Sequence, residues 1–237
     1  MIDILAFGAH PDDVELAAAG TLIHHIKNGA KVAIVDLTAG ELGTRGTVET
    51  RAAEAEDSRK IMGVQYRHNL QLRDGFFEND ENALIKVAEA IRHFRPKLVL
   101  ANAIADRHPD HGRAAMLVSR ACFLAGLPKV ITHYNEEIQD IWRPKAVYHY
   151  IQDRYIKPDL VVDISDSFQE KMKAIRAFAT QFFREGDDGP QTPISSEEFL
   201  FFIEARAREF GRSIGVEFGE GFTTERPMGI NNLLGIQ

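Results

Sequence analysis

The 237-residue chain contains a single cysteine, Cys122, and a single tryptophan. One thiol cannot form an internal disulfide, and this cysteine content is typical of a reducing compartment. No apolar stretch approaches the ~20 residues that a membrane-spanning helix needs. Asp3 stands near the start of the chain, where a signal peptide would carry basic residues. We therefore expect a soluble, cytoplasmic protein.

Positive charge is also scarce. The chain has 28 Lys and Arg against 35 Asp and Glu, which gives a formal net charge of -7. This balance argues against a nucleic acid or an anionic membrane as a partner. With 44% hydrophobic and 27% charged residues, the composition is ordinary for a globular domain with a sizeable core.

The first apolar run lacks the glycines of a dinucleotide-binding turn. The run from Ile4 to Ala9 ends in His10-Pro11-Asp12-Asp13, where a phosphate cradle would need G-x-G-x-x-G. This absence makes a nucleotide-binding oxidoreductase unlikely. Ligand sites of open α/β sheets collect at the carboxyl ends of strands, and imidazole and carboxylate groups are metal ligands. The stretch therefore indicates a catalytic metal site.

Apolar runs alternate with helical patterns in the first half of the chain, which predicts a Rossmann-like, three-layer α/β fold with a mostly parallel central sheet. We expect one domain over 1–237, with a parallel core at 1–127 and further strands, two helices and a tail at 128–237. Strands are expected at 4–9, 31–38, 66–72, 97–102, 130–133, 146–151 and 160–164. Helices are expected at 14–28, 47–62, 79–94, 111–125, 165–183 and 196–213.

Two local expectations concern the second half of the chain. Ser195 and Glu198 form a capping box at the start of the last helix. The tail after Gly219 is polar and shows no periodicity, so we expect it to pack on the body or on a neighbouring subunit without regular structure.

A second His-Pro-Asp motif, Arg107-His108-Pro109-Asp110-His111, also follows a predicted buried strand. The ends of parallel strands meet at one edge of a sheet, so the two motifs can share an ion. Two imidazoles and one carboxylate bind a divalent ion and leave positions open for water and substrate. We predict His10, Asp13 and His111 as the ligands. The alternative is turn chemistry, with the aspartates as helix caps.

Three chemically active side chains remain beside these ligands, namely Asp12, His108 and Asp110. A metal-assisted hydrolase needs a base for the attacking water, an acid for the leaving group, and benefits from a group that orients the acid. The remaining side chains match these needs. Spacing alone does not decide which aspartate of the first motif is the ligand and which is the base.

Together the motifs resemble those of the LmbE-like, or PIG-L, family of metal-dependent N-deacetylases, which remove acetyl groups from N-acetylglucosaminyl compounds. The resemblance rests on the two His-Pro-Asp motifs with Glu15, and covers nearly the whole chain. It extends to Thr38-Ala-Gly-Glu41, Gly43-Thr-Arg-Gly46 and Arg51-Ala-Ala-Glu54. The chain length and the short polar tail are most similar to the bacillithiol-biosynthesis branch.

The resemblance implies Zn²⁺ on His10, Asp13 and His111, with Asp12 as the general base. Fe²⁺ is an alternative metal in the cell, because sites of this composition accept both ions. The resemblance also implies a homo-oligomer, a hexamer in particular.

The resemblance further implies that His108 stabilises the oxyanion and protonates the leaving amine, and that Asp110 holds its ring. Arg51 is expected to contact substrate or brace the pocket. Arg107 and Arg45 are further candidate substrate contacts, because guanidinium groups bind carboxylates.

The expected reaction is zinc-dependent hydrolysis of the acetamide of an N-acetylglucosamine conjugate. N-acetylglucosaminyl malate is the preferred substrate, because arginines suit its two carboxylates. A broader amino-sugar or chitooligosaccharide deacetylase is one alternative, and a non-catalytic metal- or sugar-binding protein is another. The aromatic run Phe199, Phe201 and Phe202 is expected to be core or a subunit contact, not a substrate platform.

Overall fold

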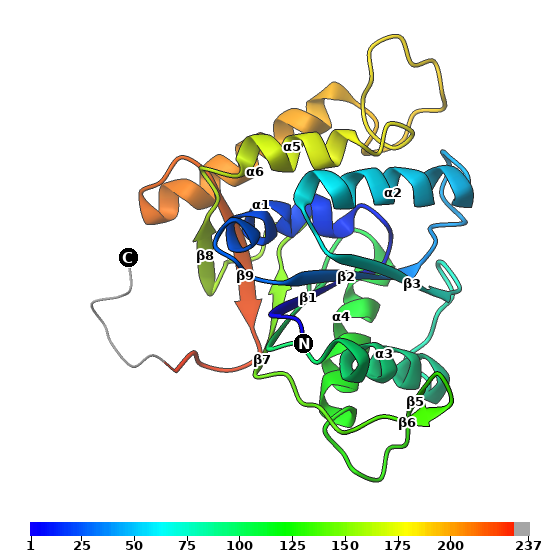
Figure 1. The fold of residues 1–237 in the computed structure, drawn as a ribbon. Helices are drawn as coiled ribbons and strands as arrows, with labels where there is room; N and C mark the ends of the chain where they lie inside the picture. The colour runs from blue at the N-terminus through cyan, green and yellow to red at the C-terminus, as the bar shows by residue number, and fades with distance from the viewer. Residues whose placement is uncertain (230–237) are drawn as a thin grey trace.

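The computed structural model describes residues 1–229, in which a seven-stranded sheet lies between two layers of helices (Figure 1). The strand order is β3-β2-β1-β4-β7-β9-β8. All neighbours from β3 to β7 pair in parallel, and β9 is antiparallel to both β7 and β8. The strands are β1 (Ile4–Gly8), β2 (Val32–Thr38), β3 (Tyr66–Leu72), β4 (Leu98–Ala101), β7 (Ala146–Tyr150), β8 (Leu160–Asp163) and β9 (Gly219–Thr224).

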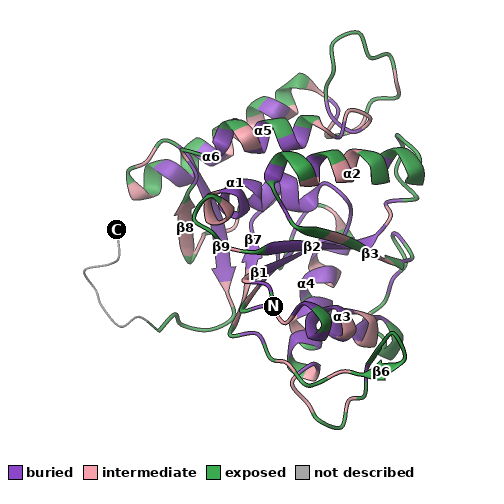
Figure 2. Ribbon diagram, in the orientation of Figure 1, coloured by how far each residue is buried: buried purple, intermediate pink, exposed green. Residues whose placement is uncertain are grey.

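Helices cover both faces of this sheet. One layer contains α1 (Asp13–Lys27), α2 (Val48–Met62), α5 (Phe168–Arg176) and α6 (Glu197–Ile214), and the other contains α3 (Glu81–Phe94) and α4 (Pro109–Leu124). Every residue of β1 and β2 is buried, as expected for parallel strands covered on both faces (Figure 2). The predicted α/β fold is confirmed. Among the described residues, no helix is both long and apolar enough to cross a membrane.

The topology brings the two His-Pro-Asp motifs to one edge of the sheet. β1 and β4 are parallel neighbours, with Ile4 opposite Leu98 and Ala6 opposite Leu100. The first motif connects β1 to α1, and the second begins α4 after the loop that follows β4. Both motifs therefore lie at the carboxyl ends of adjacent strands, where α/β folds place their ligands.

The expectation of an irregular tail after Gly219 is wrong, because Gly219–Thr224 forms β9 inside the sheet. A Cβ on Gly219 would lie 2.9 Å from the backbone nitrogen of Gly211, and a Cβ on Gly221 would lie 3.0 Å from the Phe210 ring, both in α6. Helix α6 thus packs so closely on β9 that larger residues do not fit. The glycines that make this packing possible also hide the strand pattern. Residues 230–237, the remainder of the tail, lie outside the described residues.

Three local expectations are also wrong. Instead of a strand at 130–133, a two-residue strand, β5 (His133–Tyr134), pairs with β6 (Glu137–Ile138) in a separate hairpin. Helix α5 ends at Arg176, well before 183, and beyond it the Glu54 carboxylate accepts hydrogen bonds from the backbone N–H and hydroxyl of Thr180 (2.7 and 2.8 Å). The cap of α6 is Ser196, not Ser195, because the Ser196 hydroxyl accepts from the Phe199 N–H.

Glu220 joins β9 to two helices, and we expect the Glu220→Ala variant to be strongly destabilised. Its carboxylate accepts from the N–H groups of Gly20 (3.0 Å) and Thr21 (2.7 Å) and lies 2.6 Å from Lys171 Nζ. The variant leaves a buried ammonium group unpaired, which costs about 3–5 kcal/mol of unfolding free energy. Urea unfolding measures this loss. Glu209→Ala, at an exposed position of α6, serves as the control and should change the unfolding free energy by less than about 0.5 kcal/mol. Equal losses for both variants would show that Glu220 does not hold β9 to the two helices.

Candidate active site

The first motif forms a tight turn between β1 and α1. Asn102 Oδ1 accepts a hydrogen bond from the Ala9 N–H (2.9 Å), and Asp13 Oδ2 accepts one from the His10 N–H (3.0 Å). Asp12 has a φ of 121°, a backbone conformation that residues other than glycine rarely adopt outside functional sites. Its side chain makes no capping bond to α1 and instead lies 3.1 Å from Arg51 Nη2. The helix-capping alternative for Asp12 is therefore wrong.

The second motif opens α4 with a rigid first turn. Pro109 stands at the first helical position, where its missing N–H costs nothing. His108 is the N-cap, and its Nδ1 accepts a hydrogen bond from the Asp110 backbone N–H (3.3 Å). His111 follows within the same turn, buried beneath the cavity.

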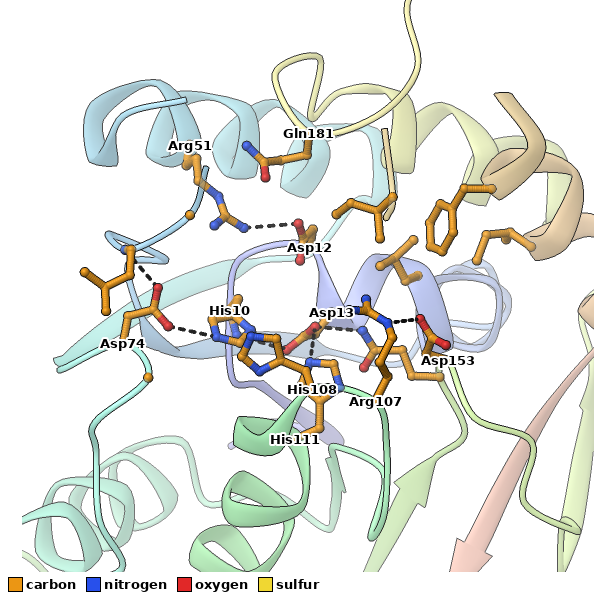
Figure 3. Close-up of a pocket in the computed structure, with 18 of the residues that line it drawn as sticks. His10, Asp12, Asp13, Arg51, Asp74, Arg107, His108, His111, Asp153 and Gln181 are labelled. Carbon is orange, nitrogen blue, oxygen red and sulfur yellow. Dashed lines mark hydrogen bonds and ion pairs between the residues drawn. The ribbon is translucent and has the colours of Figure 1, made fainter. Parts of the chain in front are cut away.

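The two motifs meet around Asp13 (Figure 3). His111 Nε2 lies 3.1 Å from Asp13 Oδ1, and His10 Nδ1 lies 3.5 Å from Asp13 Oδ2. The His10 and His111 ring centroids are 5.8 Å apart. The structure thus places the three side chains predicted as ligands next to one another, with Asp13 in contact with both histidines.

Two further groups could hold an ion at the same place. Nitrogen atoms of His10, His108 and His111 all lie within 4.8 Å of one another. The same holds for ligand atoms of His10, Asp74 and Asp110. Among the described residues, His10 belongs to both groups, and neither group includes Asp13.

Four polar residues that the sequence analysis missed hold the predicted ligands in place. Asp106 lies 2.6 Å from His111 Nδ1, and Asp74 lies 3.0 Å from His10 Nε2. Asn102 Nδ2 and Gln152 Nε2 donate to the two oxygens of Asp13 (3.0 and 2.7 Å). Such partners fix the ring and carboxylate orientations of metal ligands. All four follow the carboxyl ends of parallel strands β3, β4 or β7. This position after a predicted strand is the sequence feature that could have identified them.

Buried carboxylates dominate the electrostatics of the site. Burial alone would lower the pKa of His111, but the Asp13 charge and the Asp106 hydrogen bond raise it to about 9. Burial also opposes the charged form of His10, yet Asp110, Asp13 and Asp74 raise its pKa well above the usual value. The pKa of Asp13 is held well below its usual value, against burial, by His111 and His10. The site attracts positive charge, and its donor set suits a divalent ion, which displaces such protons on binding.

Asp12 lies beside these groups in a different environment. Burial raises the pKa of its carboxyl group to about 7, although the Arg51 charge opposes the shift. A carboxylate with a pKa near neutrality suits general base catalysis. Arg51 is itself buried and also contacts the carbonyl groups of Pro11 and Gly40, so it braces the turn that presents Asp12.

The predicted contact between Asp110 and His108 runs through the main chain and not through the carboxylate. The Asp110 carboxylate accepts from the Gly75 N–H (2.9 Å) and from Arg113 Nη1 (2.9 Å), and lies 3.5 Å from His10 Nε2. Burial and the neighbouring His10 lower the pKa of His108, which favours the neutral imidazole.

The three candidate arginines differ in their positions. Arg51 and Arg107 line a cavity of about 240 Å³ above the motifs, and Arg107 Nε lies 2.8 Å from Asp153. Arg45 does not line this cavity and instead pairs with Asp187. The structure therefore places Arg45 outside the cavity in which it was predicted to contact substrate.

Aromatic residues of α6 line the same cavity. Phe199 and Phe202 belong to its wall, together with Leu16, Ile194 and Ile203. Both rings pack against the hydrophobic core, as expected, and they also face the cavity. Phe201, in contrast, is 61% exposed and lies outside the cavity.

Comparison with known proteins assigns the family. The PIG-L model, described as GlcNAc-PI de-N-acetylase, matches residues 5–122, which include both motifs. A diacetylchitobiose deacetylase from Thermococcus kodakarensis is 31% identical over 189 residues, which are 76% of this chain and 70% of the relative. The chain belongs to the PIG-L family. The resemblance seen in the sequence is thereby confirmed, and so is the prediction of an amide-hydrolysing deacetylase.

Two further comparisons match three quarters of the chain or more. A probable N-acetyl-α-D-glucosaminyl L-malate deacetylase from Bacillus subtilis is 28% identical over 195 residues, 75% of this chain and 82% of the relative. The crystal structure of a conserved protein from Thermus thermophilus superposes with a TM-score of 0.87 at 32% identity and covers 98% of this chain and 99% of that chain. The likeness of fold to this solved structure therefore extends through the C-terminal half of the chain.

Proposed function

We propose that this PIG-L enzyme hydrolyses the acetamide of an N-acetylglucosamine conjugate in a zinc-dependent reaction and releases acetate and a free amine. The observation that carries the proposal is the convergence of His10, Asp13 and His111 from two distant motifs, beside Asp12, in one cavity. The relatives from Thermococcus and Bacillus support the choice of substrate, because both are named for N-acetylated amino sugars.

His10, Asp13 and His111 would hold the zinc ion. When bound, the ion supplies Lewis-acid polarisation of the amide carbonyl and lowers the pKa of water. Asp106, Asn102 and Gln152 orient the ligands through the hydrogen bonds described above. Because these partners come from two separate loops, after β4 and after β7, the ligands are positioned before any substrate arrives.

Asp12 takes the proton from the attacking water. Its carboxylate faces the cavity, is buried, and is oriented by Arg51 Nη2 at 3.1 Å. The strained φ of Asp12 keeps the side chain out of the helix-capping position. The Arg51 charge also stabilises the carboxylate form, so the base is available at neutral pH.

His108 stabilises negative charge on the carbonyl oxygen by donating a hydrogen bond, and the proton that Asp12 takes from the attacking water goes to the leaving nitrogen. Its Nδ1 accepts the Asp110 N–H, so in the neutral imidazole the proton resides on Nε2. That nitrogen is then a hydrogen-bond donor on a ring that lines the cavity. The backbone of α4 therefore sets the tautomer of His108. From the sequence, the Asp110 side chain was predicted to hold this ring.

Two substrates stand out within this class. N-acetylglucosaminyl malate is supported by the Bacillus relative. Diacetylchitobiose is supported by the Thermococcus relative.

The proposal is tested by amine release from N-acetylglucosamine and its conjugates. The purified protein is stripped with a chelator, dialysed, and assayed before and after addition of Zn²⁺ or Fe²⁺. We expect no amine from the stripped protein and restored release with one molar equivalent of metal. A protein that binds the metal but releases no amine from any acetylated amino sugar would instead be a non-catalytic binding protein.

A further inference from the structure

One side of the active-site cavity is an apolar wall, which we define as Phe199, Phe202 and Ile203 of α6 together with Ile194. The three α6 residues stand at positions i, i+3 and i+4, so they lie on one face of the helix. Leu42, from the glycine-containing loop after β2, also lines the cavity and is 59% exposed. The cavity therefore joins a polar floor, formed by the two motifs, to an apolar side.

The rings of this wall are held in fixed positions. Phe199 stacks between Phe182 and Phe202, with centroid distances of 6.1 and 5.8 Å and interplanar angles of 2° and 29°. The Arg206 guanidinium lies 4.9 Å from the centre of the Phe202 ring and donates to the Asp153 carbonyl (3.0 Å). Arg206 thus ties α6 to the segment that also carries Gln152, the partner of Asp13. A preorganised apolar surface binds a ring with little entropic cost.

The charges of the cavity do not favour an anionic aglycone, the group attached to the amino sugar. Four carboxylates line it (Asp12, Asp13, Asp74 and Asp153) and two guanidinium groups (Arg51 and Arg107), so with the histidines neutral, as metal binding requires, its side chains carry a formal charge of -2. A divalent ion would neutralise this charge without leaving a positive excess. Both arginines already contact carboxylates, at 3.1 and 2.8 Å. A dicarboxylate would have to compete for them.

We propose that the apolar wall is the aglycone subsite of this enzyme and that it selects N-acetylglucosamine conjugates whose aglycone is a neutral ring, a second sugar or an aryl group. This inference rests on the deacetylase function proposed above. The apolar face of the ring packs on Phe199 and Phe202, while the acetamide reaches Asp12 and His108 on the polar floor. Under this assignment the malate conjugate is the poorer substrate.

The test compares kcat/KM of the zinc-loaded enzyme for four compounds. These are N-acetylglucosamine, N,N′-diacetylchitobiose, 4-nitrophenyl N-acetylglucosaminide and N-acetylglucosaminyl malate. We expect at least one of the two ring conjugates to exceed both the free sugar and the malate conjugate by about tenfold. The chitobiose and nitrophenyl compounds show whether the favoured ring is a sugar or an aryl group.

Two variants of α6 test whether the substrate preference depends on the apolar wall. Phe202→Ala removes a ring of the wall, so the kcat/KM ratio of the favoured ring conjugate to the free sugar should fall about tenfold, mainly through KM. Phe201→Ala removes an exposed ring from the same turn and is the matched control, with an unchanged ratio. Phe202→Leu keeps an apolar side chain and should retain part of the preference, which guards against a folding defect in the alanine variant.

The possible failures are distinguishable. If no compound yields amine, the proposed function itself is wrong. If amine is released but the malate conjugate is preferred, or Phe202→Ala and Phe201→Ala have equal ratios, the deacetylase function stands and the aglycone subsite is wrong.

Discussion

The Asp12→Asn variant is expected to lose about 10²–10⁴-fold in kcat while it retains its metal. Asparagine keeps the size and the contact with Arg51 but cannot accept a proton from water. The Asp12 carboxylate faces Arg51 and is not part of the donor pairs around Asp13, so metal content should remain near that of the wild type. Amine release and elemental analysis on the same preparation measure both quantities.

Asp57→Asn is the matched control for this substitution. Asp57 lies on α2 with a side chain that is 68% exposed, next to Lys60. Its variant should have wild-type kcat. If Asp12→Asn retained activity within about threefold of the control, a loss well below that expected of a general base, Asp12 would not be the base.

The His111→Ala variant is expected to lose both metal and activity. His111 is one of the three proposed ligands, and its Nε2 faces Asp13 while its Nδ1 is held by Asp106. Even the loss of an outer partner typically costs 10–100-fold in metal affinity, so the loss of a ligand should cost more. Metal titration followed by elemental analysis measures the change.

His133→Ala is the control for His111→Ala, because His133 is exposed in the β5–β6 hairpin. It should bind one equivalent of metal, as the wild type does. Full metal occupancy in the His111→Ala variant would show that His111 is not a ligand of the ion.

The sequence contained enough to predict the α/β core and both motifs. Buried parallel strands appear as continuous apolar runs, and β1, β2 and β4 did so. The order of the strands was not predictable from local pattern. Strand β9 was not predicted, because its glycines have no side chains to show the alternating pattern of a strand. The close approach of α6 requires these glycines.

The same contrast holds for the site. His10, Asp13 and His111 belong to motifs whose composition shows their chemistry. Asp74 and Gln152 are isolated polar residues in loops, and only the fold shows that they contact His10 and Asp13. The apolar wall was missed for another reason, because a phenylalanine that lines a cavity and one that fills a core have the same helical spacing.

The most direct test of the central claim is a crystal structure of the zinc-loaded protein with anomalous data collected above and below the zinc edge. We predict one anomalous peak within about 2.0–2.2 Å of donor atoms of His10, Asp13 and His111. A peak held by His10, His108 and His111 without Asp13, or no peak at this edge of the sheet, would contradict it.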